Sequence, residues 1–101
     1  MSIAQGIVLP AAEIAAVCRR YGVRELSLFG SAARNEIGPD SDIDLIVDYL
    51  PSAHPSLFDL IGLKDELSDL LGRKVDLGVK RSIKPRYKDP IFAEARVIYA
   101  A

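Results

Sequence analysis

Apolar residues at spacings of three and four predict two amphipathic helices in this chain. The first is expected over 10–21, where a proline begins the helix and Gly22 ends it. The second is expected to start after Ser56, whose hydroxyl suits an N-terminal cap, and to end at Gly72. Its broad apolar stripe comprises Leu57, Leu60, Ile61, Leu67, Leu70 and Leu71. Both helices are therefore expected to bury one side.

Shorter apolar runs predict strands at 25–29, 42–49 and 74–79. A short helix over 31–36 and a turn at 38–41 are expected to join the first two strands. After the third strand we expect a basic loop and then a last helix, which Asp89-Pro90 would begin. That helix would carry Ile91, Phe92, Ala95, Ile98 and Tyr99. This order predicts an α/β fold in which helices pack against a sheet.

The composition is that of an ordinary globular protein. Of the 101 residues, 50% are hydrophobic and 27% are charged, and the formal net charge is −1. This length suits a single domain over residues 1–101, and the near-neutral charge gives no sign of direct nucleic-acid binding. Cys18 is the only cysteine, so no internal disulfide can form, which fits a reducing compartment. Without a signal-type stretch or a membrane-spanning run, we expect a cytoplasmic protein.

A glycine and a serine stand where the first predicted strand ends. Gly30 has no Cβ, so the backbone there can approach an anion closely. Ser31 follows it and can offer both its backbone N–H and its hydroxyl as donors. The pair Gly30-Ser31 therefore predicts a turn that holds phosphate.

Two aspartates begin the second predicted strand. Asp42 and Asp44 are two positions apart, so in a strand they project to the same side and can reach one divalent cation. Mg²⁺ is commonly held by one or two carboxylates together with substrate phosphates, and a nucleoside triphosphate supplies such phosphates. Asp76 in the third predicted strand is the candidate third ligand, because an aspartate buried among apolar neighbours is costly unless it is paired or binds metal. An aspartate that faces solvent is the alternative.

These residues resemble the nucleotidyltransferase superfamily related to DNA polymerase beta, and the short chain resembles its minimal nucleotidyltransferase (MNT) branch. The family pattern is a Gly-Ser turn, a short helix with an arginine, an Asp-x-Asp strand and a later aspartate on a neighbouring strand. It corresponds here to residues 28–34, 41–45 and 75–77, and one departure is Asn35, where many members have glycine. The resemblance implies the polymerase beta-like palm fold, a small mixed sheet with helices packed against it.

The resemblance also implies roles for these residues. Gly30, Ser31 and Arg34 would bind the nucleotide, and the three aspartates named above would form the catalytic centre and hold two Mg²⁺ ions. ATP would be the substrate, and AMP would pass to an acceptor hydroxyl. Proteins of the MNT type are often paired with HEPN proteins, and some are antitoxins that adenylylate a tyrosine of a HEPN ribonuclease toxin. We therefore expect a Mg²⁺-dependent protein adenylyltransferase that acts on a HEPN toxin.

Two other functions remain open on the sequence alone. The chain could be a binding module that neutralises its partner by occlusion, with acids that hold only metal or nucleotide. The second alternative function is nucleic-acid binding through a basic cluster around Tyr87. The cluster comprises Lys80, Arg81, Lys84, Arg86 and Lys88. A solvated loop is the commoner origin of such a cluster, and the net charge makes this function the weakest of the three.

Three further residues have ordinary interpretations. Arg34 is as well explained by a surface arginine near an acid as by a phosphate contact. His54 has no His or Cys companions at the spacings that zinc requires. Asp48 shares the strand side of Asp44 but lies farther along the strand, so we expect it at an exposed strand end.

Overall fold

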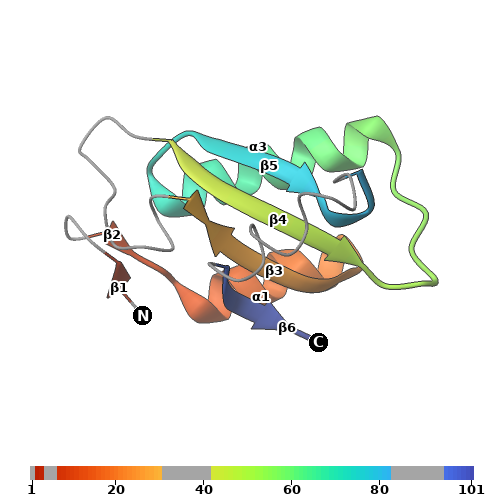
Figure 1. Cartoon of the computed structure of the whole chain (residues 1–101), viewed down its shortest axis with the longest axis horizontal. Coiled ribbons are helices and arrows are strands. Elements are labelled where there is room, and N and C mark those ends of the chain that lie inside the picture. The colour runs from red at the N-terminus through yellow and green to blue at the C-terminus, as the bar shows by residue number, and fades with distance from the viewer. Residues whose placement is uncertain (1, 4–6, 31–41, 83–94) are drawn as a thin grey trace.

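A computed structural model describes residues 2–3, 7–30, 42–82 and 95–101. Two helices, α1 (Ala11–Arg20) and α3 (Leu57–Leu71), pack on one face of a sheet (Figure 1). The sheet contains β3 (Val23–Phe29), β4 (Ile43–Tyr49), β5 (Val75–Val79) and β6 (Arg96–Ala100), in the order β5-β4-β3-β6. Two short strands, β1 (Ser2–Ile3) and β2 (Ile7–Val8), pair with each other, and a 3-10 helix, η2 (Lys80–Ser82), follows β5. Within these residues no helix has the length and apolarity to cross a bilayer.

The sheet is mixed. β3 pairs antiparallel with both β4 and β6, whereas β4 and β5 run parallel. α3 connects those two parallel strands, because parallel neighbours need a crossover of a dozen or more residues. The mixed α/β sheet and the three predicted strands are therefore confirmed.

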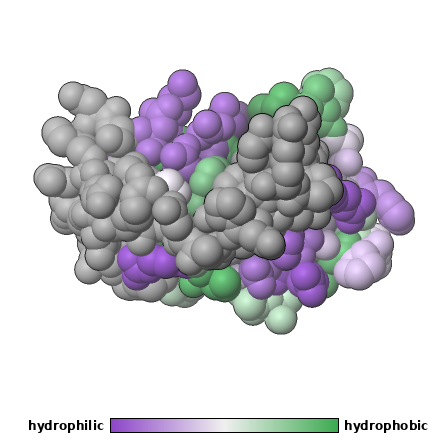
Figure 2. All heavy atoms as spheres, viewed as in Figure 1, coloured by the Kyte–Doolittle hydropathy of each residue, from purple (hydrophilic) through white to green (hydrophobic). Residues whose placement is uncertain are grey.

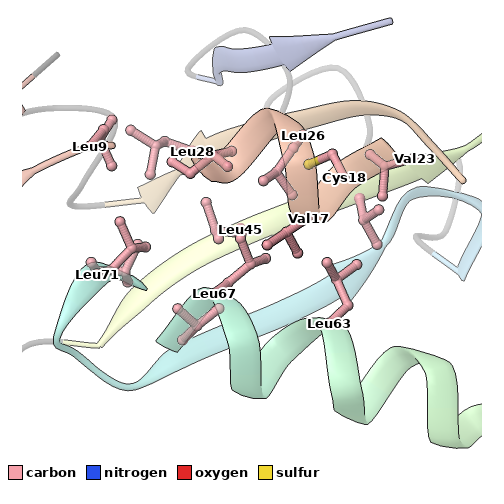
Figure 3. Packing of buried hydrophobic residues seen from close by; sticks show 14 of the residues in the cluster. Leu9, Val17, Cys18, Val23, Leu26, Leu28, Leu45, Leu63, Leu67 and Leu71 are labelled. Carbon is pink, nitrogen blue, oxygen red and sulfur yellow. The ribbon is translucent and has the colours of Figure 1, made fainter. Parts of the chain in front are cut away.

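Alternation along β4 separates the core from the acids. Ile43, Leu45 and Val47 are fully buried and belong to the cluster that α1 and α3 cover (Figure 3). Asp44 lies between two of them and projects to the opposite face, because successive side chains of a strand alternate. The run Ile-Asp-Leu thus places a carboxylate on the sheet face away from the helices.

Leucines of α3 complete the core. Leu63 and Leu67 are fully buried and lie near Val17 of α1 (Figure 3). The predicted apolar stripe of α3 was wrong in part. Leu57 and Ile61 were predicted to be in it but are exposed, whereas Leu63 was not predicted and is buried. Ile61 is two positions before Leu63, which turns its side chain about 200° around the helix, away from the sheet.

Local signals set both ends of α3. The hydroxyl of Ser56 accepts a hydrogen bond from the Asp59 backbone N–H at 3.2 Å, and Asp59 Oδ2 accepts one from the Ser56 N–H at 2.8 Å. This reciprocal pair is a capping box with aspartate in place of glutamate. Gly72 follows the last turn in the left-handed conformation. The predicted start and end of this helix are confirmed.

The predicted last helix was wrong in its C-terminal part, and its start lies outside the described residues. Residues 96–100 form β6 instead, so Ile98 and Tyr99 lie in a strand that pairs with the free edge of β3. Val97, Ile98 and Tyr99 are β-branched or aromatic and favour a strand once a pairing edge is present. The predicted short helix at 31–36, the turn at 38–41 and the residues Ile91 and Phe92 lie outside the described residues. The pairing of β1 with β2 was not predicted.

Burial of the single cysteine leads to a first testable result. Cys18 is 0% exposed, and burial raises the pKa of its thiol from 9.0 to about 11. The thiolate is the reactive form, so we expect iodoacetamide at pH 8 to modify the native protein at least about 100-fold more slowly than the urea-unfolded chain. Mass spectrometry of timed samples measures both rates. Similar rates in the two states would show that Cys18 is accessible and would contradict this packing.

Candidate active site

Gly30, the part of the predicted phosphate turn that the structure describes, lies beside the predicted carboxylate strand. Phe29, the last residue of β3, pairs with Asp44 of β4, and Gly30 follows directly. Gly30 has a φ of +64°, and a Cβ built on it would lie 2.8 Å from Oδ2 of Asp44. A side chain here would therefore displace the Asp44 carboxylate, and the positive φ also favours glycine. Glycine is therefore the residue that lets the backbone lie against this carboxylate.

A second acid joins from the neighbouring strand. The parallel register places Asp44 of β4 opposite Asp76 of β5. Neighbouring strands are about 4.8 Å apart, and residues paired in register project to the same face. The exposed Asp76 and the half-buried Asp44 therefore stand side by side on the face away from the helices.

Asp42 precedes β4 and lies beside the start of β5. Its side chain is 46% exposed, and its Oδ2 lies 3.8 Å from Nζ of Lys74. The backbone N–H of Ile43 donates to the carbonyl oxygen of Lys74 at 2.9 Å, which fixes the starts of the two strands together. Lys74 was not singled out in the sequence, although it flanks β5 as Asp42 flanks β4. It is a cation beside the acids and partly balances their charge.

The neighbouring acids act on Asp44 electrostatically. Burial raises the pKa of the Asp44 carboxyl, and the negative charges of Asp76 and Asp42 raise it further. Both causes disfavour the ionised form, so the charged acid is held at a cost in the folded chain. A cation placed between these carboxylates would reverse that penalty.

The donor set fits a hard divalent cation. Carboxylate oxygens are the ligands that Mg²⁺ prefers. In the part of the chain that the structure describes, no three His, Cys, Asp or Glu side chains are arranged to hold a metal ion by themselves. Mg²⁺ commonly takes only one or two carboxylates and completes its shell with water and phosphate oxygens. Asp44 with one neighbouring acid is therefore consistent with a site that substrate phosphate completes.

Two predicted nucleotide-binding residues, Ser31 and Arg34, lie outside the described residues, so their roles stay predictions. Most of the basic cluster beyond Ser82 lies outside them as well. His54 is exposed, and no metal-binding group among the described residues includes it.

The expectation for Asp48 was wrong. Its side chain is only 18% exposed and accepts hydrogen bonds from Arg24 Nε at 2.9 Å and Arg24 Nη2 at 2.6 Å. Nζ of Lys80 lies 4.0 Å from the same carboxylate oxygen. Asp48 is thus an ion-paired residue on the same sheet side as Asp44. Only strand pairing brings these cations to it, so no local signal in the sequence could have shown the contact.

Comparison with known sequences gives consistent matches. The profile of the family described as "Nucleotidyltransferase domain" matches residues 14–99. The chain is 43% identical over 83 residues to a Methanocaldococcus jannaschii protein whose designation as a protein adenylyltransferase is provisional, and the match covers 82% of this chain and 87% of that protein. It is 42% identical over 80 residues to the protein adenylyltransferase MntA of Thermococcus cleftensis, covering 79% of this chain and 77% of MntA.

Solved structures share the fold. A crystal structure of a toxin–antitoxin with AMP-PNP aligns with a TM-score of 0.74 at 21% identity, over 92% of this chain and 75% of that chain. A structure of the tri-AMPylated Shewanella oneidensis HEPN toxin in complex with MNT antitoxin aligns with a TM-score of 0.64 at 19% identity, over 90% of this chain and 70% of that chain. At these identities the likeness concerns the fold.

Proposed function

Because this chain belongs to the nucleotidyltransferase domain family, we propose that it transfers AMP from ATP to a hydroxyl group of a partner protein. The observation that carries the proposal is the contact of Gly30 with Asp44, in register with Asp76. This arrangement supports the proposal because Mg²⁺ is usually bound by one or two carboxylates together with substrate phosphates. The curated relative MntA, at 42% identity, is named a protein adenylyltransferase, which supports protein as the acceptor.

In this proposal each residue has a defined task. The backbone at Gly30 approaches the β and γ phosphates of ATP, and Ser31 donates to them. Asp42, Asp44 and Asp76 would hold Mg²⁺ together with phosphate oxygens of ATP, and the ion would offset the phosphate charge and lower the pKa of the acceptor hydroxyl. The rate gain comes mainly from alignment and charge complementarity.

The transfer step balances as a substitution at phosphorus. The acceptor oxygen forms a bond to the α phosphorus of ATP, and the bond from that phosphorus to the bridging oxygen breaks. Pyrophosphate leaves with the electron pair of that bond. In this proposal Asp76 would also help accept the hydroxyl proton, and its exposure beside Asp44 supports that role.

The proposed acceptor is a HEPN-domain toxin, with this chain as its antitoxin. Support comes from the structural neighbours, which include a tri-AMPylated HEPN toxin bound to an MNT antitoxin. The hydroxyl would belong to a tyrosine, as the family resemblance implies.

Intact-mass spectrometry tests the transfer. Incubation of the chain with ATP, Mg²⁺ and its cognate HEPN-domain protein should add one or more AMP increments to that protein. Asp76→Asn should reduce the transfer rate at least about 100-fold, in the range of lost general base catalysis, while the two proteins still associate. Asp69→Asn removes an exposed acid from α3 and serves as the matched control. Full neutralisation of the partner without any increment, by wild type and Asp76→Asn alike, would favour occlusion instead.

A further inference from the structure

Lys74 is a basic residue beside the acid group. Its Nζ lies 3.8 Å from Oδ2 of Asp42, whose charge in turn acts on Asp44, and it stands two residues before Asp76. Figure 2 shows hydrophilic surface over the start of β5, near the upper edge. The ammonium group of Lys74 is therefore close to the carboxylates that the proposed function assigns to Mg²⁺.

Two hydrogen bonds fix the peptide group that joins Lys74 to Val75. The Lys74 carbonyl oxygen accepts from the Ile43 N–H at 2.9 Å, which ties the start of β5 to β4. The Val75 N–H donates to Oγ of Ser68 at 3.1 Å, which ties the same peptide group to α3. Neither bond uses the Lys74 side chain. The backbone thus fixes where this side chain starts, and a substitution at Lys74 leaves both bonds in place.

The ion pair of Lys74 with Asp42 is weak. The two side chains are 72% and 46% exposed, and their separation of 3.8 Å exceeds the roughly 2.7–3.2 Å of an N–H···O hydrogen bond. Exposed ion pairs of this kind add little to stability. Asp42 can therefore exchange the ammonium group for another cation at little cost.

The charge at this end of the sheet favours such an exchange. Three carboxylates and the triphosphate of ATP carry more negative charge than Mg²⁺ bound among them offsets. Lysine supplies a compact positive charge on a flexible stem and commonly binds phosphate groups. When Asp42 is bound to a metal ion, repulsion between the two cations drives Lys74 away from that carboxylate. Phosphate oxygens, which bring the largest negative charge, are then its preferred acceptors.

Lys74 and Gly30 lie on opposite sides of Asp44. The sheet order is β5-β4-β3, and Lys74 precedes β5 whereas Gly30 follows β3. Because β3 runs antiparallel to β4 and β5 runs parallel to it, both residues lie at the end of the sheet where β4 begins (Figure 1). Two strand spacings of about 4.8 Å separate them by roughly 10 Å. A phosphate chain that starts at Gly30 and crosses the acids therefore leads toward Lys74.

We propose that Lys74 is a nucleotide-binding residue, which pairs with Asp42 in the metal-free chain and with a phosphate oxygen of ATP when Mg²⁺ is bound. This inference rests on the proposed function. The ammonium group would stabilise the negative charge of the phosphate from the side of the acids opposite Gly30. A surface ion pair that serves only the fold is the alternative, and it predicts no effect of the Lys74 charge on ligand binding.

Lys74→Gln tests this role, because it should change two affinities in opposite directions. Loss of a positive charge beside the acids should tighten binding of Mn²⁺ alone by about threefold, since Mn²⁺ takes the same oxygen ligands as Mg²⁺. The same change should weaken binding of a slowly hydrolysed ATP analogue in saturating Mg²⁺ at least about tenfold, as expected for a lost charge-assisted hydrogen bond. Electron paramagnetic resonance of free Mn²⁺ measures the first affinity, and isothermal titration calorimetry measures the second.

Two further variants serve as controls. Lys74→Arg keeps the positive charge and should hold both affinities within about threefold of wild type. Lys64→Gln removes the same charge from α3, which lies on the other face of the sheet (Figure 1). It should change both affinities less than about twofold, because solvent and salt screen a charge at that distance.

The outcomes separate this inference from the proposed function. If Lys74→Gln binds the ATP analogue as tightly as wild type, the role of Lys74 is wrong, even where AMP transfer is observed. A joint loss of Mn²⁺ and nucleotide affinity with a lower Tm would equally overturn it, because Lys74 would then only support the fold. If the two affinities move in opposite directions but wild type adds no AMP to its partner, the role of Lys74 stands and the proposed function fails.

Discussion

Asp42→Asn combined with Asp44→Asn is expected to abolish Mg²⁺-dependent binding of ATP. Asn keeps the shape of each side chain but removes the charge that a divalent cation requires. Asp44 is the acid closest to the turn, since it pairs with Phe29 and a Cβ on Gly30 would meet its Oδ2. Isothermal titration calorimetry with a slowly hydrolysed ATP analogue and Mg²⁺ should give no heat of binding for this variant.

The fold should survive this change and gain stability at neutral pH. Because burial and the two neighbouring acids raise the pKa of Asp44, the folded chain binds this proton more tightly than the unfolded chain does. The free energy of unfolding therefore falls as pH rises through the interval between the unfolded and folded pKa values. At pH 7 the ionised Asp44 costs stability, and Asn removes that cost. We expect a Tm at pH 7 no lower than that of wild type.

Asp48→Asn is the control on the same strand side. It removes a negative charge four residues farther along β4, beyond the acid pair. ATP affinity in Mg²⁺ should stay within about threefold of wild type, because a partly exposed charge at that distance acts weakly through solvent. Unchanged ATP binding by the double aspartate variant would remove these acids from the proposed site.

Gly30→Ala is expected to cause the second large loss, of about 100-fold in the rate of AMP transfer. Its new Cβ would lie 2.8 Å from Asp44 Oδ2, so the carboxylate or the turn has to move. Misplacement of a reacting group by about 1 Å can cost a hundredfold in rate. The left-handed backbone also costs an L-residue roughly 1–2 kcal/mol. Gly30→Val should lower nucleotide affinity further. Single-turnover kinetics and thermal unfolding measure the two effects.

Gly72→Ala separates the two costs. Gly72 has a φ of +65°, close to that of Gly30, but a Cβ there would meet nothing within 4 Å. This variant should lose roughly 1–2 kcal/mol of stability, as Gly30→Ala does, while its rate of AMP transfer stays at the wild-type value. If Gly30→Ala and Gly72→Ala transfer AMP equally well, the contact between the turn and Asp44 has no catalytic role.

Local signals explain where prediction from the sequence worked. Ser56 and Gly72 set the ends of α3 through hydrogen bonds and backbone angles that involve only nearby residues. The apolar run in 42–49 likewise predicted a strand, which forms over Ile43–Tyr49, whereas the shared side of Asp42 and Asp44 stays a prediction because Asp42 precedes β4. These features needed no knowledge of which elements touch.

Prediction failed where a distant element decided the result. Residues 96–100 form a strand because β3 offers a free edge, and the short apolar run alone does not distinguish strand from helix. Asp48 is paired because β3 brings Arg24 beside it. Ile61 is exposed because the sheet accepts only the side of α3 that carries Leu63 and Leu67.

The sequence by itself determined the candidate chemistry: a glycine turn, two acids on one strand side and a third acid on another strand. Only the tertiary structure decided that these groups meet. The parallel register of β4 with β5 sets Asp44 opposite Asp76, and the end of β3 brings Gly30 against Asp44. Burial of one face of each strand against the helices selects such registers, and it depends on segments far apart in the chain, which local residue preferences do not encode.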